Sequence, residues 1–171
     1  MKKILIAYYS RRGQNNVNGS VINLEVGNTE VIAHKIQDLV AGDLFYIDTK
    51  QPYPEDYTEA THIAKEELNN GARPTLTAVV DNMEQYDTIF LGYPNWWGTF
   101  PMAVFTFLES YDFSGKTIIP FCTHEGGGLG KSEQDITKLC PNSEMRKAFD
   151  IQGSKVKNAN RSVKRWIKKL R

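Results

Sequence analysis

A run of glycines among polar residues lies at positions 123–133, which read THEGGGLGKSE. The P-loop that binds nucleotide phosphates has the pattern G-x-x-x-x-G-K-[ST]. Residues 130–132 match the end of that pattern, but Glu125 occupies its first position, where a carboxylate brings negative charge toward a phosphate. The dinucleotide pattern G-x-G-x-x-G also fails, because counting from Gly126 puts Lys131 in place of the last glycine. The segment must therefore be interpreted from its position in the chain.

Two adjacent tryptophans lie in a second unusual segment, YPNWWGTFP at residues 93–101. A large aromatic side chain on a loop gains free energy by stacking on a flat partner. Gly98 lets the backbone approach such a partner closely. The alternative is that one of the two rings only packs on a neighbouring helix. We predict a planar aromatic ligand beside Trp96 or Trp97.

A third polar segment begins with SRRGQNN at Ser10 and ends with GNT at a predicted helix start. A helix N-terminus presents free N–H groups and about half a positive charge, so it favours a phosphate. Ser10, Asn28 and Thr29 offer short hydroxyl and amide groups, and Arg12 offers a charged donor. The alternative is that Asn28 or Thr29 merely caps the helix and that Arg12 is solvated.

The elements that position these segments alternate along the chain between apolar runs and amphipathic stretches. Predicted strands cover residues 3–9, 43–48, 87–93, 116–123 and 145–151. Predicted helices cover residues 28–40, 55–69, 102–111, 131–140 and 155–171, and residues 70–86 form an irregular connection. Nearly continuous apolar runs are typical of strands buried on both faces of a parallel sheet. The pattern predicts an α/β fold, a doubly wound five-stranded parallel sheet with helices on both faces.

The predicted strand order, 2-1-3-4-5, brings the three unusual segments together. In open α/β sheets, ligands bind outside the carboxyl ends of the strands, where the strand order reverses. The three segments follow the first, third and fourth predicted strands. They are therefore expected to converge on one crevice of a single domain that spans residues 1–171.

The composition is that of an ordinary globular protein, with 40% hydrophobic and 24% charged residues. The net charge of +1 hides an asymmetry, because residues 155–171 hold eight Lys or Arg and no acid. The remaining 154 residues hold 13 basic and 20 acidic residues, a net charge of −7. A basic tail can bind nucleic acid or an acidic partner. We favour a docked terminal helix, because its apolar residues recur at helical spacing: Ala159, Val163, Trp166, Ile167 and Leu170.

Histidines and cysteines give no metal pattern. His124 could act as a general acid or a metal ligand, but no second His or Cys lies at ligand spacing, so no metal is expected. His34 and His62 fall on predicted helices and are expected at the surface. Cys122 and Cys140 are too few for a disulfide framework and are expected to be buried reduced thiols. No apolar run reaches the length of a membrane span, and a cytoplasmic location is expected.

In these segments the sequence resembles the flavodoxin-like FMN-binding family, in a short-chain form. The resemblance rests on YYSRRGQN with GNTEVIA, on LGYPNWWGTFP and on PFCTHEGGGLG, and it covers nearly the whole chain. It implies FMN as cofactor, with its phosphate held near Ser10 and Arg12 and its ring clasped between residues 94–98 and 123–130. The residues implied in binding are Ser10, Arg12, Asn15, Asn28, Thr29, Pro94, Asn95, Trp96, Trp97, Gly98, Thr123, His124, Glu125, Gly126, Gly127 and Gly130.

One departure from the family pattern concerns the first segment. Members usually run S-x-x-G-N-T, whereas here QNNVNGSVINLEVG separates Gly13 from Asn28. The role of residues 14–27 stays open at this point, since they can form an ordered flap over the ribityl chain or a mobile lid.

The resemblance implies a redox function, in which the flavin carries the chemistry and the protein tunes it. The first reading is an FMN-dependent electron-transfer protein with a redox partner protein or a small-molecule acceptor. The alternative is an NAD(P)H-dependent quinone or nitro reductase, so enzymatic activity stays open, and a flavin-free binding domain is a third possibility.

Glu125 disfavours a P-loop kinase. A phospho-receiver module needs carboxylates where Ser10 and Pro94 stand. No nucleic-acid or membrane partner is expected.

Overall fold

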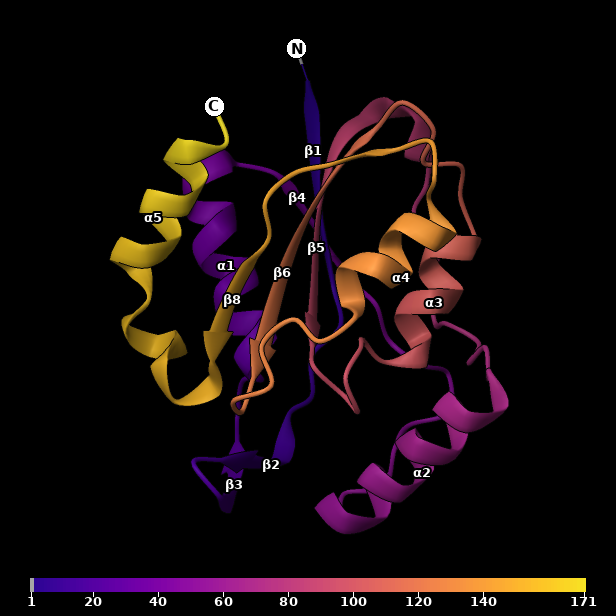
Figure 1. The fold of residues 1–171 in the computed structure, drawn as a ribbon, viewed down its shortest axis with the longest axis vertical. Coiled ribbons are helices and arrows are strands. Elements are labelled where there is room, and N and C mark those ends of the chain that lie inside the picture. The colour runs from indigo at the N-terminus through magenta and orange to yellow at the C-terminus, as the bar shows by residue number, and fades with distance from the viewer. Residues whose placement is uncertain (1) are drawn as a thin grey trace.

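The computed structural model describes residues 2–171 as an α/β/α sandwich around one parallel sheet (Figure 1). Strands run in the order β4-β1-β5-β6-β7, and β8 also pairs with β6. The strands of the sheet are β1 (Lys3–Tyr8), β4 (Asp43–Tyr46), β5 (Tyr86–Pro94), β6 (Thr117–His124), β7 (Glu144–Met145) and β8 (Phe149–Gln152). The predicted order 2-1-3-4-5 is confirmed, with two short strands sharing the fifth position.

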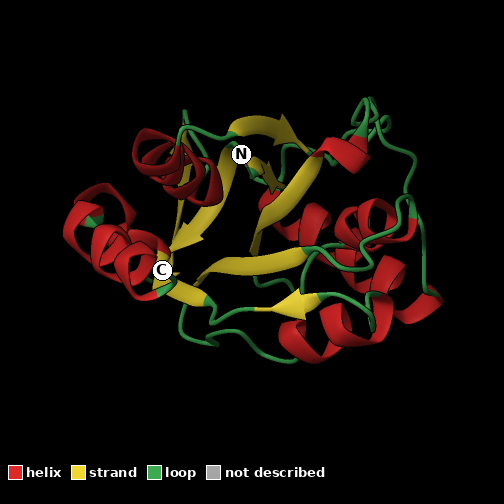
Figure 2. Cartoon of the chain, turned by 90° about the horizontal axis from the view of Figure 1, so that it is seen from above, coloured by secondary structure: helices red, strands yellow, loops and turns green. Residues whose placement is uncertain are grey.

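Five α-helices follow the strands and cover both faces of the sheet, as Figure 2 shows. They are α1 (Asn28–Val40), α2 (Tyr57–Asn70), α3 (Met102–Glu109), α4 (Ser132–Leu139) and α5 (Asn160–Lys169). Helices α1 and α5 pack on one face through one buried cluster, and α3 and α4 pack on the other. Helix α2 contacts α3 and extends past the carboxyl ends of the strands (Figure 1).

The central strands are buried because their side chains are apolar on both faces. In β5, Ile89 and Leu91 contribute to the cluster under α3, and Phe90 contributes to the cluster under α1 and α5. Fully burying a side chain of this size stabilises the fold by about 1.5–3 kcal/mol. The apolar runs thus explain why β1, β5 and β6 form the middle of the sheet and fix the positions where their loops begin.

Helix α1 begins differently from the expectation. Gly27 is the N-cap residue and no side chain of the cap accepts a hydrogen bond, so the prediction that Asn28 or Thr29 caps the helix is wrong. Both residues lie in the first turn. The Ser10 hydroxyl takes the capping role from a distance, because its Oγ accepts the Glu30 N–H at 3.1 Å.

Residues 13–24 form a β-hairpin that the sequence did not predict as such. Strand β2 (Gly13–Val17) pairs in antiparallel fashion with β3 (Ser20–Leu24), apart from the main sheet. The two residues of its turn, Asn18 and Gly19, have φ of 54° and 81°. Positive φ at both positions is the signature of the tight turns that match the twist of paired strands. We refer to residues 13–24 as the hairpin; it lies below the carboxyl ends of the strands in Figure 1.

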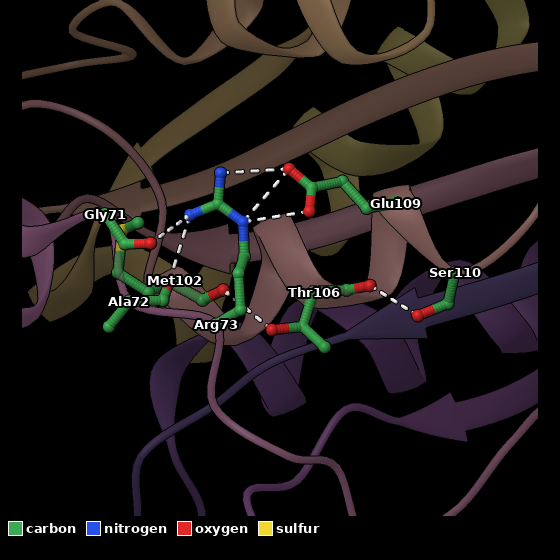
Figure 3. Close-up of polar contacts among 7 residues, drawn as sticks. All are labelled: Gly71, Ala72, Arg73, Met102, Thr106, Glu109 and Ser110. Atoms are coloured by element: carbon green, nitrogen blue, oxygen red, sulfur yellow. Dashed lines mark hydrogen bonds and ion pairs between the residues drawn. The ribbon is translucent and has the colours of Figure 1, made fainter.

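Arg73 joins the end of α2 to α3 (Figure 3). Its Nε donates to both carboxylate oxygens of Glu109, at 3.0 and 2.9 Å, and its Nη1 donates to the carbonyl groups of Gly71 and Ala72 at 3.0 Å. The guanidinium also lies 4.9 Å from the centre of the Phe105 ring. Such an exposed pair contributes little free energy, but its forked geometry fixes an orientation. The far end of α2 is thereby held in place.

The basic tail forms a docked helix, as expected. A 3₁₀ segment, η2 (Gly153–Asn158), leads into α5, in which Val163, Trp166 and Ile167 are buried. The indole N–H of Trp166 donates to the Lys147 carbonyl at 2.9 Å. The apolar face of α5 is therefore buried against the rest of the protein.

Cys122 and Cys140 are buried free thiols, as expected. Burial raises the pKa of the Cys140 thiol to about 11 and raises that of Cys122 further. His34 and His62 are exposed on their helices, again as expected. Within residues 2–171, no helix combines the length and the apolar character that crossing a membrane requires.

Candidate functional site

The carboxyl ends of β1, β5 and β6 surround two adjoining pockets. The first, of about 180 Å³, is lined by Ser10, Arg11, Asn15, Asn16, Asn28, Thr29, Tyr57, Pro94, Asn95, Trp96, Thr123, His124 and Glu125. The second, of about 350 Å³, lies against α2 and is lined by Arg11, Asn15, Tyr57, Ala60, Thr61, Ala64, Asn95, Trp96 and Trp97. Five residues line both, so the two pockets form one continuous cleft.

The structure brings most of the predicted binding residues to this cleft. Those that line it are Ser10, Asn15, Asn28, Thr29, Pro94, Asn95, Trp96, Trp97, Thr123, His124 and Glu125. Those that do not are Arg12, Gly98, Gly126, Gly127 and Gly130. Residues far apart in the sequence thus meet where the strand order reverses, as expected for this class of sheet.

The start of α1 provides hydrogen-bond donors for an anion. Within residues 2–171, the backbone N–H groups of Asn28 and Thr29 donate to no protein acceptor, whereas the next two amides are held by Ser10 and Gly27. The Thr29 hydroxyl lies 2.8 Å from that of Thr123 and links this helix start to the end of β6. Free amides with the positive end of a 13-residue helix behind them suit a phosphate.

Gly27 allows the first segment to pack against this helix start. A Cβ at position 27 would lie 2.1 Å from the Ser10 Oγ and 2.7 Å from the Arg11 carbonyl oxygen. A side chain there would push the serine hydroxyl and the chain after β1 away from the free amides. The glycine is therefore required by the local geometry of the site.

The structure assigns different roles to the two adjacent arginines. Arg12 pairs with Glu30 through two contacts, Nε to Oε2 at 3.1 Å and Nη2 to Oε1 at 2.6 Å, and this hydrogen bond raises the pKa of Arg12. Its guanidinium is thus held at Glu30 and does not line the cleft. Arg11, which is not among the expected binding residues, lines both pockets and donates to the carbonyl groups of Gln14 and Pro54 at 3.0 and 3.1 Å.

Trp96 lines both pockets, and its ring is held in place by two tyrosines. Tyr9 and Tyr53 pack edge-on against its ring, with centroid distances of 5.2 and 5.3 Å and interplanar angles of 79° and 85°. The Tyr53 hydroxyl donates to Glu67 at 2.5 Å. Burial is the main reason that the pKa values of Tyr9 and Tyr53 are raised, so both phenols stay neutral in the physiological range.

Trp97 has a strained backbone conformation and a partly exposed side chain. Its backbone φ is 58°, a value that is unusual for a bulky residue, and its side chain is 49% exposed. The indole N–H donates to the Thr61 carbonyl at 3.0 Å, and the Lys65 ammonium lies 4.6 Å from the ring centroid. These contacts fix the near end of α2 to the loop. Strain of this kind is concentrated at functional sites.

The tryptophan loop, residues 94–98, and the glycine loop, residues 125–130, pack into one unit. The Asn95 side chain accepts the Gly98 N–H at 2.9 Å and donates to the Gly128 carbonyl at 2.8 Å. A Cβ at Gly130 would lie 2.2 Å from the Gly98 carbonyl oxygen. Gly130, which does not line the cleft, thus allows the two loops to meet.

His124 has both ring nitrogens engaged. Its Nδ1 accepts the Gly126 N–H at 3.0 Å, so its Nε2 carries the proton and donates to Asp150 at 3.0 Å. The ring therefore orients the glycine loop and leaves neither nitrogen free for a metal.

The Glu125 carboxylate ties three segments together. It accepts the Asn18 N–H of the hairpin turn at 2.7 Å and the Gly153 N–H of η2 at 3.2 Å. The residue that breaks the P-loop pattern thus anchors the hairpin beside the cleft. Residues 14–27 are thus held at their turn by a residue from outside the insertion, which favours an ordered flap over a mobile lid.

Several solved structures are similar to this chain over nearly its whole length. A protein assigned as a flavoprotein from Bacteroides eggerthii is 27% identical, with 96% of this chain and 99% of the other covered and a TM-score of 0.73. A second, from Bacteroides uniformis, is 26% identical over 98% of each chain with a TM-score of 0.74. A Lactobacillus acidophilus flavoprotein in complex with FMN is 19% identical over 92% of this chain and 98% of the other, with a TM-score of 0.69, and shares the fold. No curated protein gave a sequence match.

The fold and the cleft define a doubly wound α/β protein with a ligand site at the carboxyl ends of its strands. A model of the flavodoxin family matches residues 3–170. The chain therefore belongs to the flavodoxin family, and the resemblance read from its three segments is confirmed.

Proposed function

We propose that this protein binds FMN in the cleft and uses it to transfer electrons. The observation that carries the proposal is the pair of free amides at the start of α1, which lies beside a cleft walled by Trp96. An anion site next to an aromatic wall suits a phosphate joined to a planar ring system. Membership of the family and the flavoprotein relatives support the same cofactor.

The residues present fit FMN in chemical type. The Asn28 and Thr29 amides would hold the phosphate, with the Ser10 and Thr123 hydroxyls close by. Trp96 and the tryptophan loop would bind the ring, and Glu125 is the residue of the glycine loop that lines the cleft. When bound, the flavin supplies reversible one- and two-electron chemistry.

The protein controls the environment of that chemistry. Trp96 and its tyrosine neighbours exclude water and disfavour negative charge on a bound ring, because a low-dielectric surrounding penalises ions. Backbone N–H groups of these loops that are not already bonded within the protein would favour such charge if they donated to it, whereas those of Asn95, Trp96, Gly98 and Gly126 are engaged. The balance between these two effects sets the reduction potential.

The proposal is tested by titrating the purified protein with FMN and with riboflavin, following the visible spectrum and flavin fluorescence. FMN should bind in the micromolar range or tighter, and more tightly than riboflavin by at least about tenfold, because riboflavin lacks the phosphate that the free amides would bind. Protein that binds neither flavin contradicts the proposed function. Equal binding of the two contradicts the phosphate assignment alone.

A second candidate is an NAD(P)H-dependent FMN reductase of quinones or nitro compounds. The observation that favours it is the pocket against α2, which is walled by Trp96 and Trp97 and floored by the small side chains of Ala60 and Ala64. A flat second substrate fits such a slot. Adding NADPH alone to the FMN-loaded protein separates the two functions, since only a reductase should bleach the flavin.

A further inference from the structure

Residues 153–171, which we call the basic segment, carry an uncompensated positive charge. Its eight cations are all exposed: Lys155, Lys157, Arg161, Lys164, Arg165, Lys168, Lys169 and Arg171. The segment contains no acid, and within residues 2–171 none of these eight side chains takes part in an ion pair. Eight exposed cations without ion-pair partners in the described chain give this strip a local positive potential.

One end of the basic segment adjoins the candidate flavin site. The η2 part begins at Gly153, whose N–H is held by Glu125 of the glycine loop. Lys155 shares a surface hollow with His124, which orients that loop. From there α5 leads away toward the opposite end of the sheet, as Figure 1 shows. The strip of charge therefore starts at the cleft and points away from it.

Neighbouring side chains of both signs lie near this end. Lys35 of α1 donates to the Lys157 carbonyl and to the Asn160 side chain, so a further cation lies on neutral groups at the α1–α5 contact. The Glu30 carboxylate is neutralised by the Arg12 guanidinium. The Asp150 and Glu125 carboxylates accept hydrogen bonds from neutral groups and keep their negative charge. The three cations Lys35, Lys155 and Lys157 exceed these two carboxylates by one charge at this end.

The apolar side of α5 does not have the form of a membrane-binding helix. Membrane-surface helices insert their apolar face between lipid headgroups. Here that face is buried: the Trp166 ring lies 5.8 Å from the Phe90 ring and 5.2 Å from the Phe149 ring. Only the cationic face is available, and it is complementary to an acidic protein surface.

We propose that the basic segment is the docking surface for an acidic electron-transfer protein, which meets the flavin site at η2. The inference rests on the proposed function. In the encounter one electron passes from the partner's reduced centre to the bound flavin, so the partner is oxidised by one electron and the flavin is reduced by one. The reverse transfer uses the same surface.

The position of each charge decides its effect. Screened interactions extend about 30 Å at 0.01 M ionic strength and about 8 Å at 0.15 M, so steering by the strip should weaken strongly between these conditions. Charges at η2 also lie at the point of contact and act in the docked complex. Charges near the end of α5 act only on the approach.

The experiment uses the FMN-loaded full chain with a chemically reduced plant-type ferredoxin as the acidic probe, and stopped-flow absorbance gives the rate of flavin reduction. Two variants with the same change in net charge form a matched pair. The near-end variant carries Lys155→Glu and Lys157→Glu, and the far-end variant carries Lys168→Glu and Lys169→Glu. Circular dichroism and FMN titration verify that both variants fold and bind flavin.

The expected result has two parts. The second-order rate of the unmodified chain should fall by about tenfold or more as ionic strength rises from about 0.01 to 0.15 M. At low ionic strength the near-end variant should be slower than the unmodified chain by about tenfold, and the far-end variant by less than about threefold. Light-driven reduction of the flavin by a small donor should proceed at the same rate in all three proteins.

Other outcomes overturn the inference. A rate that does not depend on salt, or equal slowing by the two variants, removes the docking surface. Micromolar binding of a DNA duplex of about 20 base pairs at 0.15 M ionic strength, equally weakened by both variants, assigns the strip to nucleic acid instead. A chain that fails to bind FMN is recognised by its spectrum before any partner is added, and that failure belongs to the proposed function.

Discussion

The tryptophan loop and the hairpin both border the cleft, but they are built in opposite ways. The tryptophan loop is five residues long, and its central ring is buttressed by Tyr9 and Tyr53 from the core. The hairpin is longer, pairs only with itself and leaves Val21 and Ile22 51% and 42% exposed. Its turn is anchored from outside by Glu125.

This difference indicates that the two regions contribute differently to the site. A loop packed on the core presents its aromatic wall in one orientation, so a flat ligand loses little entropy in using it. A self-paired hairpin can be shortened with little effect on the sheet, because none of its backbone hydrogen bonds belongs to the sheet.

Replacing the buttressed ring should have the largest effect. Trp96→Ala should weaken FMN binding by about 1–3 kcal/mol, because it removes the aromatic wall of the cleft and leaves two tyrosine edges without a partner. Trp97→Ala should weaken it less, since that indole lines only the pocket against α2 and is half exposed. Fluorescence titration measures both constants, and equal losses would contradict the division of roles.

Removing the hairpin should have a smaller effect. Deleting residues 14–27 joins Gly13 to Asn28 and gives the uninterrupted pattern SRRGNT, which keeps a glycine directly before the first turn of α1. The shortened chain should fold and bind FMN within about tenfold of the unmodified chain, a difference of about 1.4 kcal/mol. Thermal unfolding and FMN titration check this. A shortened chain that folds but cannot bind FMN would show that the hairpin is an essential wall.

Cutting the anchor of the hairpin should act locally. Glu125→Ala removes the acceptor of the Asn18 and Gly153 N–H groups. It should weaken the attachment of the hairpin turn and of η2 to the glycine loop by about 1 kcal/mol. Amide hydrogen exchange at these two residues should become several-fold faster, while exchange in β1 and β5 stays unchanged. Unaltered protection at Asn18 would mean that the turn is held by something other than this carboxylate.

The smallest effect concerns the support behind the tryptophan loop. Burial raises the pKa of Glu67 above its usual value of 4.5, and the Tyr53 hydrogen bond lowers it in part. The unfolded chain therefore loses this proton at a lower pH than the native protein, and the stability it contributes below pH 4.5 is lost as pH rises through the native pKa.

Glu67→Gln keeps an acceptor for the Tyr53 hydroxyl but does not titrate. Its free energy of unfolding relative to the unmodified chain should therefore increase between pH 4 and pH 7, by about a few tenths of a kcal/mol because the side chain is only partly buried. Urea unfolding at several pH values measures the difference. A relative stability that stays constant across this range, or decreases, contradicts the assignment.

Much of the fold could be predicted from the sequence because its central strands are apolar on both faces. Runs such as KILIAY and TIFLGY admit few other interpretations, and the alternation with amphipathic helices determines a parallel sheet. The hairpin was missed because GQNNV and SVINL are short and weakly patterned. The Asn18-Gly19 pair was the available signal, since it is a preferred sequence for two-residue hairpin turns.

The site was predicted in outline and altered in detail for similar reasons. Aromatic and glycine-rich loops at strand ends can be recognised from their composition. Which of Arg11 and Arg12 lines the cleft depends instead on which one pairs with Glu30 at the start of α1. The Ser10 hydroxyl bonds a helix amide twenty residues away. Contacts of this kind follow from tertiary packing and leave no local pattern.

The divided fifth position of the sheet affects whether a second molecule can pair with its outer edge. Strand β7 pairs with Thr117 and Ile118, and β8 pairs with residues 121–124, so the outer border of the sheet is interrupted between them. An unbroken outer strand would offer a continuous ladder of amide and carbonyl groups to a strand from a second molecule. Strand β7 has two residues and β8 has four, so each exposes only a few backbone groups for pairing. The break thereby discourages lateral association and aggregation at the border that lies beside the basic segment.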